Sequence, residues 1–344
     1  MKEQGAGADI RRKRLGRSGL LVSEVGLGTM NFGSQLSESA SHAVLDAAVD
    51  MGITFIDTAE MYASPPSADS FGRSEEIIGQ WLTRHDRDAV VIATKIVGPP
   101  DGRYQSGAHV RHGQATLDRF HIASAIDGSL RRLRTDHVDL LQFHWPDRSV
   151  PWQEQLEAVH RAREAGKVRY FGCSNESAWG LMRAIACSER YDLPRPVSVQ
   201  NVLNWLEQDE YAAVEEVCRE EGLGYIAYSP LAMGLLSGKY GGDIPVGSRF
   251  GLYERYRAQY LNEWMTTCVA AFTALAKKRG VSTVRLALAW ALTRSAAAVV
   301  LTSASRVDQL RDLAAAVELA QAEPDLALPS ADEVHHASTR GVHA

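Results

Sequence analysis

Short apolar runs alternate with amphipathic segments along this chain, and the alternation limits the folds that it can adopt. The runs have the length and composition of strands, whereas the segments between them have helical spacing. Strands that alternate with helices form parallel sheets. Eight parallel strands can close into a barrel, whereas an open doubly wound sheet more usually has six. The eight runs lie at residues 22–26, 54–56, 90–94, 138–141, 168–171, 197–200, 225–228 and 298–301.

The chain is long enough to build such a barrel as a single domain. It has 344 residues, and barrels of this kind take about 250 residues, or more when loops are inserted. We expect one domain over residues 1–344, with a core at about 15–322 and a polar C-terminal tail at about 323–344. Two connections, at 98–114 and about 231–262, are too long for plain turns. They follow the third and seventh strands, so we expect both to overhang the same end of the barrel.

Capping residues and glycines indicate where several helices begin and end. Ser74 is placed to cap a helix whose first turn carries the acidic residue Glu75. Gly166 and Gly222 each follow a helical pattern at the position that favours a left-handed backbone. The expected helices include residues 38–50, 74–82, 154–165 and 210–221.

Charge and composition exclude several classes of partner. The net charge is −5, from 37 basic and 42 acidic residues that are interspersed, so we expect neither a nucleic-acid nor a membrane partner. No apolar run approaches the ~20 residues that span a bilayer. The basic stretch at 11–14 precedes no apolar segment and is interpreted as a solvated edge. The four cysteines are widely spaced, which suits free thiols in the cytoplasm. We expect no metal site, because the nearest pair, His109 and His112, lies in a loop.

Four polar residues stand at or shortly after the ends of three strand-like runs. Asp57, Lys95 and His144 close the runs, and Tyr62 lies five residues beyond Asp57. In a parallel barrel such ends meet at one mouth, where active sites are built. Each residue alone has an ordinary alternative: a turn, a solvated amine, a half-buried loop aromatic or a satisfied strand-end imidazole. Their joint occurrence at one mouth favours a set of groups that transfers a proton.

The sequence around these residues resembles the aldo-keto reductase superfamily. The matching stretches are FIDTAEMY at 55–62, ATK at 93–95 and QFHWP at 142–146, and the resemblance runs from about Leu15 to Leu310. It is closest to the branch that contains the potassium-channel β-subunits and their bacterial relatives. The resemblance implies a (β/α)8 TIM barrel, NADP(H) as cofactor and a small-molecule carbonyl substrate. It also allows a homo-oligomer.

The same resemblance implies a catalytic tetrad, and its chemistry suits carbonyl reduction. Tyr62 is the expected proton donor, although an unperturbed phenol has a pKa of about 10. A neighbouring ammonium lowers a phenol's pKa, and Lys95 is placed to supply that charge. Asp57 would hold Lys95 as an ion pair. His144 would hydrogen-bond the carbonyl oxygen and orient it.

Further stretches are implied for the nicotinamide end of the cofactor. GLGTMN at 26–31 lacks the third glycine of a dinucleotide-binding fingerprint, because Asn31 occupies that position. In the resembled family this segment lines the barrel mouth. GCSN at 172–175 and Gln200 resemble the groups that hold the carboxamide, and YSPL at 228–231 resembles the segment whose ring stacks under the nicotinamide. The implied contacts are Gly28, Thr29, Met30, Asp57, Ser174, Asn175, Gln200, Tyr228, Ser229, Pro230 and Leu231.

The long seventh connection is implied to cover the pyrophosphate. GLLSGKY at 234–240 resembles the start of the loop that folds over the cofactor in the channel β-subunits. Lys239 and Arg249 are chemically apt for phosphate, although two solvated loop cations are the ordinary alternative. The implied contacts are Gly234, Leu236, Gly238, Lys239, Ser248 and Arg249, followed by Ser303, Ser305, Arg306 and Gln309 from the segment after the eighth strand.

That last segment, SASRVDQL at 303–310, opens a helix, so free N–H groups are expected to point at an anion. Ser305 and Arg306 would bind a 2′-phosphate, which favours NADP over NAD. Four positions depart from the family pattern, among them Asp312 in place of a glutamate and Leu203 in place of a common tyrosine. Ser303 replaces a usual glycine, and Leu313 replaces an asparagine that contacts the adenine in many relatives.

The main hypothesis is therefore an NADPH-dependent reductase of an aldehyde or ketone. Its expected substrate contacts are Tyr62, His144 and Trp145, with Met30, Asn31, Tyr104 and Trp205 as further candidates.

Three alternatives remain open. The first is an NADP(H)-binding regulatory subunit of the channel β-subunit type. The second is a specialised reductase of a nucleotide-linked keto-deoxysugar, in which Arg103, Arg111 and Arg119 meet a diphosphate. The third is a structural barrel that has lost its cofactor.

Overall fold

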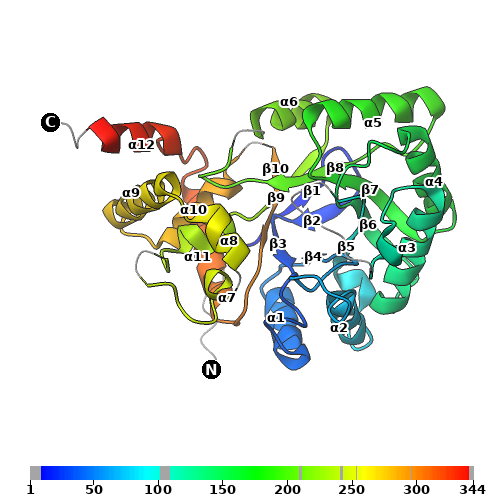
Figure 1. The fold of residues 1–344 in the computed structure, drawn as a ribbon, viewed down its shortest axis with the longest axis horizontal. Coiled ribbons are helices and arrows are strands. Elements are labelled where there is room, and N and C mark those ends of the chain that lie inside the picture. Colours follow the sequence, from blue (N-terminus) through cyan, green and yellow to red (C-terminus); the bar gives the residue numbers. More distant parts are fainter. Residues whose placement is uncertain are drawn as a thin grey trace.

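A computed structural model places eight parallel strands in a closed barrel surrounded by helices (Figure 1), which confirms the predicted (β/α)8 fold. It describes residues 9–100, 109–208, 211–240, 243–252, 254–294 and 296–340. Around the barrel the strands follow the order β10-β3-β4-β5-β6-β7-β8-β9. Their bounds are β3 Val25–Gly28, β4 Phe55–Asp57, β5 Val91–Ile96, β6 Val138–Phe143, β7 Val168–Ser174, β8 Ser198–Val202, β9 Gly224–Tyr228 and β10 Ala297–Thr302.

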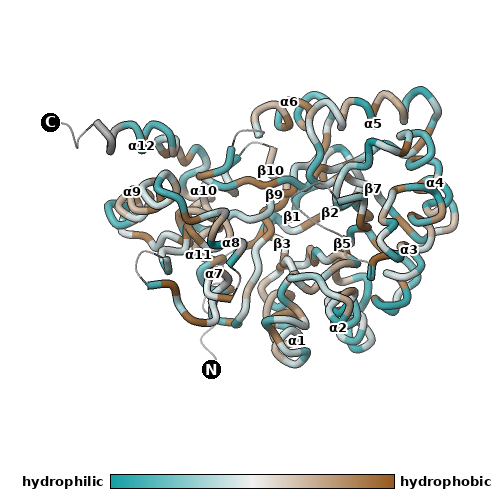
Figure 2. The backbone as a smooth tube through the Cα atoms, in the orientation of Figure 1, coloured by the Kyte–Doolittle hydropathy of each residue, from teal (hydrophilic) through white to brown (hydrophobic). Residues whose placement is uncertain are grey.

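The strands are buried on both faces of the barrel because successive side chains are apolar. Ala93 and Leu140 belong to an inner apolar cluster. Their chain neighbours Ile92 and Leu141 belong to the outer cluster, which is shared with the helices. Side chains alternate between the two faces of a strand, so each strand contributes to both layers. Figure 2 shows hydrophobic segments along the strands and hydrophilic colour on outer helices such as α2 and α5.

An N-terminal hairpin, absent from the sequence prediction, precedes the barrel. Strands β1 (Arg12–Arg14) and β2 (Leu21–Ser23) pair antiparallel. The predicted first run, 22–26, is therefore two strands divided at Glu24. This buried carboxylate accepts Arg11 at 2.8 Å and lies 3.5 Å from Lys13, so the basic stretch forms a solvated edge strand held by one buried acid.

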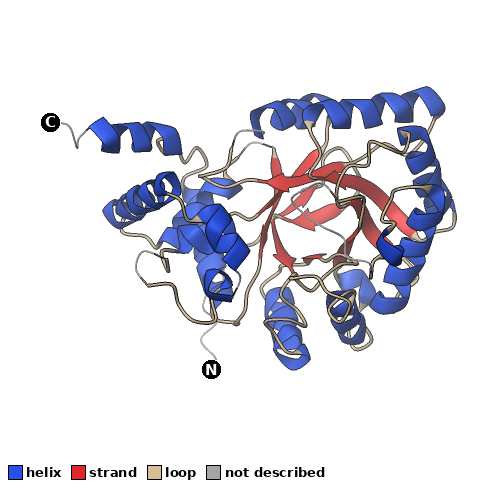
Figure 3. Ribbon diagram, in the orientation of Figure 1, coloured by secondary structure: helices blue, strands red, loops and turns tan. Residues whose placement is uncertain are grey.

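The helices lie around the strands of the barrel (Figure 3), and those that were predicted follow the predicted boundaries closely. Helix α1 has the predicted bounds, and α4 and α6 end just before Gly166 and Gly222, whose φ angles are +73° and +70°. The prediction that Ser74 caps α2 is wrong. Gly72 is the N-cap of this helix, and the Ser74 hydroxyl donates to the Thr29 carbonyl at 3.0 Å. The helices are α1 Glu38–Asp50, α2 Arg73–Leu82, α3 Arg119–Leu133, α4 Trp152–Glu164, α5 Ala178–Tyr191, α6 Tyr211–Glu221, α7 Arg249–Leu252, α8 Glu254–Tyr260, α9 Glu263–Arg279, α10 Thr283–Leu292, α11 Gln309–Ala322 and α12 Ala331–Arg340.

The two long connections contain short helical segments. The connection after β9 carries a 3-10 helix at Ala232–Ser237, followed by α7 and α8. The connection after β5 ends in a 3-10 turn at Arg111–Gly113, and its residues 101–108 lie outside the described part. The C-terminal tail also has structure, because α12 lies beside α9 and the Cys268 thiol donates to the Ala331 carbonyl. All four cysteines are free thiols.

None of the helices in the described part of the chain is both long and apolar enough to cross a membrane.

Candidate active site

The four residues predicted at the strand ends lie together at the barrel mouth. The Lys95 Nζ donates to the Asp57 carboxylate at 2.5 Å and to the Tyr62 hydroxyl at 3.5 Å. The rings of Tyr62 and His144 meet edge to face, with their centres 5.7 Å apart. The predicted proximity is therefore observed, while the catalytic role of the four groups stays a prediction.

Strand register explains why the polar groups converge. Ala93 and Leu140 point into the barrel, so Lys95 and Gln142, two residues further along the same strands, point inward as well. Lys95 and Gln142 are also register partners across β5 and β6. Asp57 ends β4 beside Ala93. The apolar filling of the barrel thus gives way to a polar layer at its C-terminal end.

Lys95 is buried, with 1% of its surface exposed, and its three donor positions have acceptors. Besides Asp57 and Tyr62, it donates to the Thr58 carbonyl at 2.8 Å. Burial lowers the pKa of Lys95 below its ordinary value, and the negative charge of Asp57 opposes that effect. An ammonium held in this position favours ionisation of the Tyr62 phenol.

Two buried amides hold the far oxygen of Asp57, and sequence reasoning missed one of them. Gln200 donates to Asp57 Oδ1 at 2.7 Å and Gln142 donates to the same oxygen at 3.3 Å. Gln142 lies on β6, two residues before His144, which directly follows that strand, so strand alternation would have placed Gln142 in the polar layer. Gln200, predicted to hold the carboxamide, contacts Asp57 in this structure.

His144 is buried between Tyr62 and its own neighbour Trp145. Its ring stacks on Trp145 with centres 3.9 Å apart, and its Nδ1 has no hydrogen-bond partner. Burial lowers the pKa of His144 well below its ordinary value, and the positive charge of Lys95 adds to the effect. The imidazole is therefore neutral near pH 7 and can offer one N–H to an oxygen.

This neutral state predicts a loss of stability on acidification. In the unfolded chain His144 takes up a proton near pH 6.5, whereas in the folded chain it stays neutral to lower pH. Protonation therefore favours the unfolded chain, and the free energy of unfolding falls as the pH decreases below about 6.5. We expect wild-type protein to lose unfolding free energy between pH 7.5 and 5.5 more steeply than His144→Gln. Urea unfolding at several pH values measures both slopes, and equal slopes would contradict a depressed pKa.

The residues predicted for the nicotinamide form a connected group beside His144. The Tyr228 hydroxyl donates to Asn175 Oδ1 at 2.7 Å, and Asn175 Nδ2 donates to the His144 carbonyl at 2.8 Å. The Ser174 hydroxyl donates to the Gln200 carbonyl at 2.8 Å. Asn175 has a φ of +53°, a left-handed conformation that asparagine tolerates better than most residues. The structure brings these predicted residues together.

Thr29 connects the first loop to the tetrad. Its N–H and its hydroxyl both donate to the Asp57 carbonyl at 3.0 Å. Asn31, two residues further along, is buried, and its Nδ2 donates to the Ala304 carbonyl at 3.1 Å. The first loop is thereby joined to both the tetrad and the segment after β10.

The segment after β10 is exposed, as a phosphate site requires. Gln309 begins α11, and its side-chain oxygen accepts the Ser305 N–H at 2.7 Å. Arg306 is exposed and pairs with Asp308 at 3.0 Å. Leu313 is buried in the core, so the position at which relatives carry an asparagine faces inward here.

The connection after β9, which is expected to cover the pyrophosphate, shows few contacts between its predicted cofactor-binding residues. Lys239 is exposed, and its Nζ lies 5.0 Å from the centre of the Tyr240 ring. Ser248 accepts the Gly251 N–H at 3.3 Å in the first turn of α7. Lys239 and Ser248 therefore remain predicted cofactor contacts, together with Arg249.

Trp205 was wrongly expected to border the substrate. Its side chain is 1% exposed, packs against Phe272 of α9 and donates to the Pro329 carbonyl at 2.8 Å. Trp145, in contrast, lies at the mouth beside His144. Tyr104 lies outside the described residues.

The predicted diphosphate-binding arginines are not available as a set. Arg111 forms an ion pair with the buried Glu60, at 3.0 Å from each carboxylate oxygen. Arg119 is exposed on α3 and lies 3.9 Å from Glu157. Arg103 lies outside the described residues.

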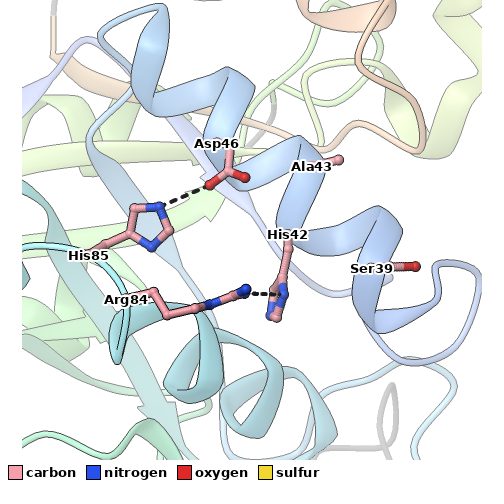
Figure 4. Close-up of a pocket in the computed structure, with 6 residues that line it drawn as sticks. All are labelled: Ser39, His42, Ala43, Asp46, Arg84 and His85. Atoms are coloured by element: carbon pink, nitrogen blue, oxygen red, sulfur yellow. Dashed lines mark hydrogen bonds and ion pairs between the residues drawn. The ribbon is translucent and has the colours of Figure 1, made fainter.

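A hollow of about 420 Å³ lies outside the barrel, between α1 and α2 (Figure 4). Its polar groups already bind one another: Arg84 donates to His42 at 2.8 Å, and His85 lies 3.1 Å from Asp46. No cluster of three or more metal ligands occurs among the described residues. The mouth of the barrel, and not this hollow, is therefore the candidate active site.

Comparisons with known proteins agree with this geometry. The aldo/keto reductase family model matches residues 24–327. "Protein tas" of Escherichia coli (strain K12) is 38% identical over 333 residues, which cover 91% of this chain and 95% of that protein. The "Uncharacterized oxidoreductase YrpG" of Bacillus subtilis (strain 168) is 37% identical, covering 89% and 90% of the two chains. A "Probable voltage-gated potassium channel subunit beta" of Oryza sativa subsp. japonica is 34% identical, covering 88% and 89%.

The chain belongs to the aldo/keto reductase family and is an oxidoreductase that acts on carbonyl groups. The predicted branch is confirmed as well.

Proposed function

We propose that the chain reduces aldehydes or ketones with NADPH and that Tyr62 gives the proton. The observation that carries this proposal is the position of Lys95, whose Nζ contacts both Asp57 and the Tyr62 hydroxyl. The ammonium supports proton release from the phenol, and Asp57 keeps the ammonium in place. Neutral His144, beside Tyr62, is suited to hydrogen-bond the carbonyl oxygen. The proposal includes a cytoplasmic location, which the free thiols favour.

The residues present fit a nicotinamide cofactor. Amide and hydroxyl groups of Asn175, Gln200 and Ser174 gather beside His144, and such groups match the donors and acceptors of a carboxamide. Exposed Ser305 and Arg306 match a 2′-phosphate. Bound NADPH would supply the hydride, and the chain's own groups orient the carbonyl and provide the proton.

The proposal is tested by binding and turnover of the wild-type protein. NADPH and NADH are titrated by fluorescence, and turnover is then followed on a panel of aldehydes, ketones and keto-sugars. Tight NADPH binding with turnover is expected. Binding of neither cofactor would contradict the proposal.

Replacing Arg306 should separate the two cofactors. Arg306→Ala removes the cation proposed for the 2′-phosphate, so we expect NADPH affinity to fall about tenfold or more while NADH affinity is unchanged. The control is Arg311→Ala, which removes an exposed arginine further along α11. Equal losses for both cofactors would contradict a 2′-phosphate contact.

A regulatory subunit is the second candidate, supported by similarity to the protein described as a potassium channel subunit beta. Cofactor binding without turnover on the panel, together with a stable protein partner, would favour it. The paired arrangement of Lys95, Asp57 and Tyr62 favours catalysis instead.

A further inference from the structure

We propose that Glu60 and Arg111 are a positioning pair that holds residues 109–113, the returning end of the connection after β5, against the mouth and so keeps an apolar wall beside the substrate. The proposal rests on the reductase function proposed above. Glu60 lies between Asp57 and Tyr62 in the sequence and is 2% exposed. Arg111 comes from the far end of the connection after β5 and was expected to bind a diphosphate.

The pair is a two-pronged ion pair that also binds the backbone of Val97. Arg111 Nη1 and Nη2 donate to Glu60 Oε2 and Oε1, each at 3.0 Å. Glu60 Oε1 also accepts the Val97 N–H at 2.6 Å, and Arg111 donates to the Val97 carbonyl at 2.8 Å. Both polar groups of Val97 are therefore bound by the pair. Such a planar fork fixes geometry as well as charge.

These contacts reach the catalytic groups through short stretches of backbone. The Glu60 N–H donates to the Lys95 carbonyl at 3.0 Å, and Val97 lies two residues after Lys95. Glu60 itself lies two residues before Tyr62. The guanidinium therefore ties the returning end of the connection to the segments that carry the amine and the phenol.

The backbone at Arg111 is held in an unfavourable conformation. Arg111 and His112 have φ angles of +45° and +57°, in the left-handed region that L-residues other than glycine rarely adopt. Such conformations persist where surrounding contacts determine them. Two backbone hydrogen bonds, from Gly113 to Val110 and from Gln114 to Arg111, close this turn, and the fork to Glu60 anchors its side chain.

The residue before the turn forms part of an apolar cluster at the mouth. Val110 is buried with Met61 and Val97 in this cluster, which also includes Trp145 and has Tyr62 packed against it. Arg111 thus determines where Val110 lies relative to the two predicted substrate contacts. Since the Glu60 carboxylate neutralises Arg111, this wall suits an uncharged substituent on the carbonyl carbon.

The proposal is tested with Glu60→Gln, Arg111→Met and the double variant, beside Arg119→Met as a control for loss of a nearby exposed arginine. Amide hydrogen exchange of the cofactor-free protein is followed in peptides covering 109–117. Steady-state kinetics are measured on the best uncharged carbonyl and on a carboxylate-bearing analogue. We expect faster exchange at 109–117 and a KM for the uncharged carbonyl raised about tenfold or more, with kcat and its pH profile little changed. Arg119→Met should match the wild-type protein in exchange rate, KM and kcat. The wild-type protein should prefer the uncharged carbonyl to the carboxylate-bearing analogue.

Unchanged exchange and KM in folded variants would overturn the proposal. So would a lower kcat or a shifted pH profile at constant KM, because the pair would then act on Tyr62 or Lys95 and not on the substrate wall. If the single variants do not fold, the double variant decides by the same measurements, since it buries neither charge alone. A wild-type protein without turnover would refute the reductase function, and the exchange result would still decide whether the pair holds the connection.

Discussion

Tyr62→Phe should lower kcat by about 10²–10⁴-fold, the range typical of a positioned general acid. The substitution removes only the hydroxyl that contacts Lys95 Nζ at 3.5 Å. The ring remains, so its edge-to-face contact with His144 and its packing in the mouth cluster should persist. Cofactor affinity should therefore stay near the wild-type value. Single-turnover kinetics with NADPH and the best carbonyl of the panel would measure the chemical step directly.

A surface tyrosine provides the matched control. Tyr191→Phe removes a hydroxyl from the exposed end of α5, where the residue is 42% exposed, and should leave turnover unchanged. If Tyr62→Phe turned over every active substrate at the wild-type rate, another group would have to supply the proton. A loss of cofactor affinity as large as the loss of kcat would instead indicate that the Tyr62 hydroxyl orders the barrel mouth.

The barrel could be predicted because its signals are local. Runs of apolar residues, caps and terminal glycines are set by near neighbours in the sequence, and the bounds of α1 follow from them. The hairpin could not be separated from β3, because the break at Glu24 depends on contacts with Arg11 and Lys13. Ser74 looked like a cap, but Thr29, distant in sequence, takes its hydroxyl. Long-range partners override the local pattern in both cases.

The candidate site was predictable to the extent that strand ends converge. Asp57, Lys95 and His144 were expected to meet because their strands are parallel, and they do. The role of Gln142 was harder to infer. Strand alternation places its amide in the polar layer, but only the structure shows that it contacts Asp57. The pairing of Glu60 with Arg111 depends on a left-handed turn at Arg111 and His112, which no local sequence pattern predicts.

Lys95→Met should destabilise the protein by about 3–5 kcal/mol, because it leaves the buried Asp57 carboxylate without its cation. Gln142 and Gln200 still donate to Asp57 Oδ1, so the loss should fall toward the lower end of that range. Urea unfolding at pH 7 measures it, provided that the m-value is unchanged.

The size of this effect tests whether Lys95 and Asp57 act as a buried pair. In the matched control, Lys167→Met breaks a half-exposed ion pair with Asp127 of similar length, 2.7 Å, and should cost about 1 kcal/mol or less. Adding Asp57→Asn to Lys95→Met removes the stranded charge, so the double variant should be more stable than the sum of the single losses predicts. Additive losses would mean that the two groups do not stabilise each other. The ammonium would then be held at Tyr62 by the Thr58 carbonyl alone, and the role of Asp57 in catalysis would have to be sought elsewhere.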